Sequence, residues 1–285
     1  MIKKLLLILM LNSIYTICFC QHTVLLQGPY KPKSKYQNTV WSEHLLDIKP
    51  EGDSTLVEEG MPRKLFRPIM ERDTFSSNAI VSTGRLNKTK EYPIVMEVHL
   101  PGNNVSNFPT VILYGAAHED SIPQMDSIEF IPKNASLNNM YKEQSLQLFK
   151  NAFHYLNPPH YFFHIGDTIS TNTIIPSGLL GIRLYYNIST NYKLIAVKKN
   201  IAYFDLKYIV RIKFPNSQAV IVNGQGSGSG TGSFTYHIKR HYFLYNETFM
   251  NTNTIMQVYN PANNLYIKFL INEKAHSVVA FRQIK

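Results

Sequence analysis

The stretch Tyr203–Phe214, YFDLKYIVRIKF, alternates between two kinds of side chain. Tyr208 and Val210 fall on one side of an extended chain, whereas Lys207 and Arg211 fall on the other. Because successive side chains of a strand point to opposite faces, this period of two predicts a strand with one packed face and one wet face. That pattern is typical of an antiparallel sheet.

Similar runs occur along most of the chain, which contains 18 Tyr and 16 Phe, residues that suit half-buried pleated surfaces. The polar segment Pro50–Asp73 has several Gly and Pro residues and little periodicity, and is predicted as a long connection. One amphipathic helix is predicted near 138–156, where Leu146 and Phe153 fall on one face and Pro158 ends the pattern.

These patterns predict a mainly β fold, α+β at most, with two curved antiparallel sheets or half-barrels and one amphipathic helix. Four segments are expected: a signal peptide (1–20), an N-terminal β region (21–137), a helix and connector (138–160) and a C-terminal antiparallel β region (161–285).

The first twenty residues have the order of a signal peptide: Lys3 and Lys4, then an apolar run, then small residues before a cleavage site between Cys20 and Gln21. The run is too short for a stable membrane anchor. The bulky Phe19 before Cys20 disfavours a lipoprotein. We therefore expect a periplasmic or secreted protein that does not span the membrane after cleavage, and whose mature form lacks both cysteines of the chain.

The tract Gly224–Gly232 places glycine at every second position: Gly224, Gly226, Gly228, Gly230 and Gly232. A phosphate-binding loop would need a Lys or a following helix, and the sequence shows neither. A flexible linker remains an alternative, but a strict period of two favours a strand. We predict a structural strand whose glycines permit sharp curvature or the close approach of another element.

Candidate sites for chemistry are sparse. His118-Glu119-Asp120 is the densest titratable cluster, yet no second metal-ligand element accompanies it. The sequence predicts no catalytic residue, no cofactor and no metal site. It therefore does not support an enzymatic function, although it does not exclude one. The 29 Lys and Arg exceed the 19 Asp and Glu, but they are scattered, which argues against a nucleic-acid partner.

The predicted helix, the segment Tyr161–Thr168 and the Gly tract leading into Phe234-Thr235-Tyr236 together resemble a domain family of unknown function in exported β-rich proteins of gut-type Gram-negative bacteria. Ile165 stands in place of the family's Val, and His237 in place of its Asp. The resemblance implies curved sheets or half-barrels joined by a helical connection, distantly similar to periplasmic lipoprotein carriers that hold acyl chains.

The leading functional expectation is an exported, non-enzymatic binding or carrier protein for a lipid or another apolar or amphipathic ligand. A structural or interaction protein of the cell envelope is the alternative, and it predicts an exposed aromatic patch or an unpaired edge strand. A carbohydrate-active enzyme comes third, since it requires carboxylates, or a His and a carboxylate, that converge in space.

Overall fold

The computed structural model describes residues 23–26, 28, 30–51, 68–99, 110–118, 123–131, 142–143, 145–147, 150, 160–179, 182–214, 221–260 and 265–284. Nearly all of them lie in strands, so the predicted mainly β fold is confirmed. The strands are β1 (Val24–Leu25), β2 (Lys35–Glu51), β3 (Ile69–Thr83), β4 (Glu91–His99), β5 (Thr110–His118), β6 (Gln124–Ile131), β7 (Phe162–Phe163), β8 (Thr168–Leu179), β9 (Ile182–Lys198), β10 (Ile201–Lys213), β11 (Ile221–His237), β12 (Tyr242–Asn260) and β13 (Leu265–Ile284).

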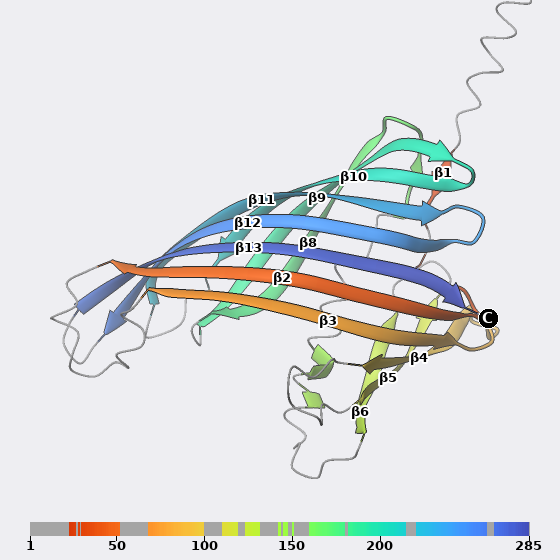
Figure 1. Ribbon diagram of the computed structural model, residues 1–285, viewed down its shortest axis with the longest axis horizontal. Coiled ribbons are helices and arrows are strands. Elements are labelled where there is room, and N and C mark those ends of the chain that lie inside the picture. Colours follow the sequence, from red (N-terminus) through yellow and green to blue (C-terminus); the bar gives the residue numbers. More distant parts are fainter. Residues whose placement is uncertain are drawn as a thin grey trace, which may run out of the picture.

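The strands form two antiparallel sheets. One is the two-stranded pair β1-β7, and the other has eleven strands in the order β6-β5-β4-β3-β2-β13-β12-β11-β10-β9-β8. In Figure 1 the long strands β2, β3, β11, β12 and β13 run side by side. Because β2 pairs with β13, the two β regions that the sequence separates, 21–137 and 161–285, contribute to one continuous sheet.

The segment Pro50–Asp73 was expected to be a connection, but its residues from Ile69 onward belong to β3, where Ile69 pairs with Ile48 and Asp73 with His44. Pro50 and Glu51 also belong to β2, and residues 52–67 lie outside the described part. The expectation was therefore wrong at the two ends of the segment, where ladder hydrogen bonds, rather than alternating hydrophobicity, hold the chain in place.

The predicted helix is described at residues 142–143, 145–147 and 150, which are helical, and its remaining residues lie outside the described part. The predicted signal peptide, including Cys20 and Gln21, also lies outside the described residues.

The large sheet is strongly curled. The hydroxyl of Tyr186 in β9 donates a hydrogen bond of 3.0 Å to Oε2 of Glu273 in β13. Strands β10, β11 and β12 lie between these two strands. In a flat sheet, with about 4.8 Å between neighbouring strands, the two residues would be roughly 19 Å apart. The face that carries both side chains is therefore concave, and we call it the inner face; the opposite face is the outer face.

The Gly tract lies in β11, at the centre of this curl, with its glycines on the inner face. A Cβ atom on Gly228, Gly230 or Gly232 would run into backbone oxygens of β12. Across this glycine row, the hydroxyl of Tyr208 in β10 lies 3.1 Å from Oγ1 of Thr248 in β12. The absence of side chains on β11 therefore lets the strands on either side of it approach each other.

Two apolar clusters fill opposite ends of the inner face. Cluster 1 gathers side chains from most of the strands, and in it the rings of Phe204 and Phe234 stack with centroids 4.4 Å apart. Cluster 2 packs β8, β9 and β10 against β2, β12 and β13. Its buried members are Ile48, Ile175, Leu184, Ile188, Val210, Ile212, Met256, Val258, Ile267, Phe269 and Ile271.

Candidate functional site

Between the two clusters, the inner face carries polar side chains. We call this band the waist and define it by His44, Tyr186, Tyr208, Thr252 and Glu273. It lies near the middle of the long strands β2, which has 17 residues, and β13, which has 20. One end of each strand reaches cluster 1 and the other end reaches cluster 2. A polar band set between two apolar clusters is the most distinctive chemical feature of the described fold.

Glu273 is the centre of the waist. Its carboxylate accepts hydrogen bonds from the hydroxyls of Tyr186, at 3.0 Å, and Thr252, at 3.3 Å. Nε2 of His44 lies 2.7 Å from its other oxygen. Thr252 and His44 come from β12 and β2, the strands paired on either side of β13, whereas Tyr186 comes from β9 and reaches Glu273 only because the sheet curls. Such charge-assisted hydrogen bonds fix the orientation of the carboxylate.

The waist is accessible to solvent. The side chain of His44 is 38% exposed and that of Glu273 is 28% exposed. On the neighbouring strand, Phe75 also belongs to the inner face, since it pairs with Ser42, and it is 45% exposed. Strand β4 pairs with β3 only from Asn78 onward. The first half of β3 is thus an edge in the described sheet, and the exposed part of the waist lies close to it.

Charge is distributed unequally between the two faces. Glu71, Asp73 and Glu273 share the inner face, as the pairing of β3, β2 and β13 shows. At the described inner-face positions of β2, β3 and β8 to β13 there is no Lys or Arg, although the chain contains 29 of these residues. The waist therefore favours a positively charged or hydrogen-bond-donating group.

Two tyrosines of the inner face, the buried Tyr192 and the half-buried Tyr208, keep their hydroxyl protons. Burial raises the pKa of Tyr208, and its hydrogen bond with Thr248 opposes this shift only in part. Burial likewise raises the pKa of Tyr192. Both hydroxyls consequently stay protonated over the physiological range.

The chemical capacity of the waist is that of a paired imidazole and carboxylate. A carboxylate that orients a His is the arrangement of a general base. The described residues contain no group of three or more His, Cys, Asp or Glu side chains placed to hold a metal ion. The pair is equally suited to binding a polar head group, and the surrounding apolar clusters favour that use.

The residues singled out from the sequence lie elsewhere. The five glycines shape the inner face without supplying a functional group. His118 ends β5, whereas Glu119 and Asp120 lie outside the described residues. Sequence reasoning missed His44 and Glu273, which are 229 positions apart. They meet because β2 pairs with β13, a pairing that no spacing rule in the sequence reveals.

Comparisons with known proteins give no family. No protein-family model matches the chain, and no curated protein matches it. Among solved structures, the outer membrane protein OprG from Pseudomonas aeruginosa aligns with 7% sequence identity and a TM-score of 0.25, over 90% of this chain and 99% of OprG. That TM-score is too low to support an inference about fold or function.

Among the described residues, no helix has the length and apolar character needed to cross a membrane.

Proposed function

We propose that the protein is a non-enzymatic binding or carrier protein that holds an amphipathic ligand at the waist. The observation that carries this proposal is the solvent-accessible His44–Glu273 pair between the two apolar clusters of the inner face. A polar head group would meet Glu273 there, with Glu71 and Asp73 on the same face. The ligand class is an amphipath whose head is cationic or donates hydrogen bonds.

The apolar part of the ligand would lie on the exposed ring of Phe75 and extend toward the apolar clusters at either end of the waist. A site that combines a large apolar lining with a few placed polar groups is typical for small molecules. Export to the periplasm, expected from the first twenty residues, belongs to the same proposal, and it would make lipids of the cell envelope the available ligands.

The experiment is native mass spectrometry, with lipid extraction, on protein purified from its own host. We expect a co-purified amphipath on the wild-type chain and its loss from Phe75→Ala. Ile209→Ala is the matched control, because Ile209 is an exposed apolar side chain on the outer face. Wild-type protein that carries no ligand and binds none of the envelope lipids added back would overturn the proposal.

A second candidate is an interaction protein of the envelope. The first half of β3 is unpaired on one side in the described sheet, and exposed strand edges can pair with another chain. The exposed rings of Tyr161 and Phe162 provide an aromatic surface beside β7. Cross-linking in the native host through a photoreactive residue at position 76, on the β3 edge, would capture a protein partner under this second function and none under the first.

A further inference from the structure

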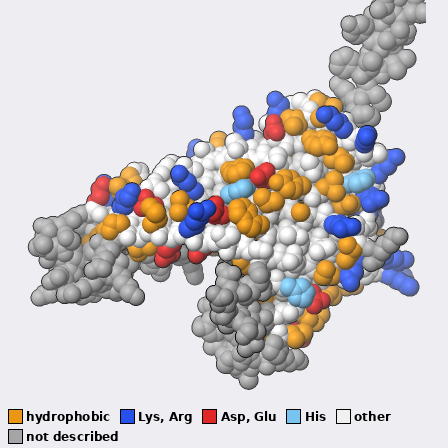
Figure 2. All heavy atoms as spheres, in the orientation of Figure 1, with side chains coloured by type: hydrophobic (Ala, Val, Ile, Leu, Met, Phe, Trp, Pro, Cys, Tyr) orange, Lys and Arg blue, Asp and Glu red, His pale blue; other side chains and the backbone are white. Residues whose placement is uncertain are grey.

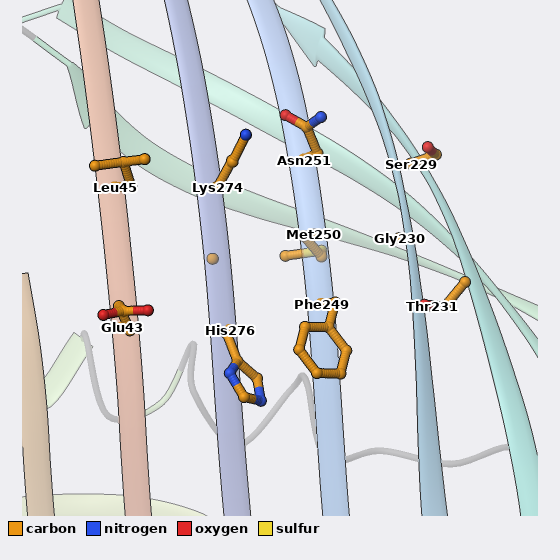
Figure 3. A pocket seen from close by; sticks show the side chains of 11 residues that line it. Glu43, Leu45, Ser229, Gly230, Thr231, Phe249, Met250, Asn251, Lys274 and His276 are labelled. Carbon is orange, nitrogen blue, oxygen red and sulfur yellow. The ribbon is translucent and has the colours of Figure 1, made fainter. Parts of the chain in front are cut away.

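A groove of about 480 Å³ crosses the outer face over β2, β13, β12 and β11 (Figure 3). The pairing of these strands arranges its side chains in two adjacent rows. One row contains Glu43, His276, Phe249 and Thr231, and the other contains Leu45, Lys274, Asn251 and Ser229. The groove is on the opposite face of the sheet from the waist and shares no side chain with it.

Two aromatic rings of the first row, those of Phe249 and His276, pack together and form what we call the aromatic platform. The rings of Phe249 and His276 stack with centroids 4.0 Å apart and an interplanar angle of 19°. Trp41 packs against His276 in a T-shaped arrangement, with ring centroids 5.0 Å apart. Phe249 is 45% exposed, so one of its surfaces remains available to a ligand. Such a flat, exposed ring suits the apolar C–H face of a sugar.

The groove's own acids already have partners. Nε of Arg72 donates to Glu43 at 2.6 Å. Nε2 of His276 lies 3.0 Å from Glu247, which borders the platform. Within the described part of the chain, the ammonium group of Lys274 has no ion-pair partner, and its side chain is exposed. The unneutralised charge of the groove is therefore positive.

The residues around the groove add a further positive charge and several neutral polar groups. Thr231 pairs with Lys207 of β10, which places a second exposed cation on the outer face next to the groove. Asn251, Ser229 and Thr231 add an amide and two hydroxyls along the rim. Figure 2 shows hydrophobic side chains interspersed with charged ones over β12, β13 and β2, rather than one continuous apolar patch.

The geometry points to a binding site for an acidic saccharide, with a pyranose ring stacked on Phe249 and its carboxylate paired with Lys274. Hydroxyls of the sugar exchange hydrogen bonds with Asn251, Ser229 and Thr231. A lone aromatic platform, flanked by neutral donors, fits a sugar better than a nucleic-acid strand, which needs successive stacking rings along a basic track. This inference is independent of the ligand proposed for the waist.

The test is a titration of the full chain with a hexamer of galacturonic acid, followed by calorimetry or tryptophan fluorescence, since the only Trp of the chain, Trp41, contacts the platform. We expect affinity to fall at least about tenfold in Phe249→Ala and in Lys274→Gln, and to fall with rising salt. Lys213→Gln, on the outer face of β10 away from the groove, is the control and retains wild-type affinity.

Three outcomes would overturn the inference. They are an affinity for neutral maltohexaose equal to that for the acidic hexamer, tighter binding of a uridine hexanucleotide than of either sugar, and full affinity in Lys274→Gln. Lys274 is exposed, so the Lys274→Gln variant is expected to fold and to give a result even if Phe249→Ala does not.

Discussion

The hydroxyl of Tyr186 lies 3.0 Å from Oε2 of Glu273, although three strands separate β9 from β13 in the sheet. This hydrogen bond can form only because the large sheet is curled. The glycines of β11 allow the sheet to curl, and the curl brings Tyr186 of β9 to Glu273 of β13. The other partners of Glu273, Thr252 and His44, come from the strands that pair with β13 on either side. Because successive side chains alternate between the faces, the carboxylates of Glu71, Asp73 and Glu273 lie on the inner face and the ammonium groups of Lys207 and Lys274 lie on the outer face.

A double-mutant cycle tests this contact. Tyr186→Phe and Glu273→Gln each remove part of one interaction, so their effects on the free energy of unfolding should not add. We expect a coupling of at least about 0.5 kcal/mol, because residues in contact couple by roughly 0.5–3 kcal/mol. Urea unfolding of the four proteins measures it. Strict additivity would mean that the two side chains do not meet in solution.

The glycine row predicts that substitutions at neighbouring positions of β11 have very different effects on the free energy of unfolding. In Gly230→Ala the new Cβ would meet the carbonyl oxygen of Phe249, so β11 and β12 would have to separate. We expect a loss of about 1–3 kcal/mol in the free energy of unfolding. Ser229→Ala, which changes the adjacent exposed position on the outer face, should stay within about 0.5 kcal/mol of wild type. Equal effects of the two substitutions would contradict this role for Gly230.

Two histidines at the turn between β11 and β12 should make the protein less stable in mild acid. Burial, and then the nearby Arg240, lower the pKa of His237 below its ordinary 6.5. Burial, and then Lys31, lower the pKa of His241 in the same way. The unfolded chain therefore binds more protons than the folded chain between the lowered values and 6.5. Their contribution to stability is complete above that pH and is lost as the pH falls.

Urea unfolding at pH 7.5 and pH 5.5 (both chosen for this window) checks the sign. We expect the double variant of His237→Gln and His241→Gln to lose less stability between the two conditions than the wild type. The lowered pKa of Asp167, held by the backbone N–H of His164, does not interfere, because its ordinary value is 3.8. An equal loss in variant and wild type would remove these two histidines from the explanation.

The sequence predicts the local features of this fold better than its long-range ones. The alternation in Tyr203–Phe214 marks β10 because each side chain faces either the apolar clusters or solvent. The first half of β3 escaped prediction because its side chains are exposed on both faces, so no period of two develops from Ile69 to Ser76. The waist could not be predicted, since the His44–Glu273 contact depends on the long-range pairing of β2 with β13, and the Tyr186–Glu273 contact depends on the curl about β11.

The charge of the waist provides the most direct test of the proposed function. The measurement is the affinity of the protein for two amphipaths of equal chain length, dodecylamine and dodecanoate, by calorimetry below their micelle-forming concentrations. Because the described inner face carries Glu71, Asp73 and Glu273 and no Lys or Arg, we predict that the amine binds at least about tenfold more tightly, a difference of about 1.4 kcal/mol. In Glu273→Gln this preference should shrink, whereas Asp205→Asn on the outer face should retain it. Equal affinities for the two amphipaths, or tighter binding of dodecanoate, would contradict a cation-accepting site at the waist.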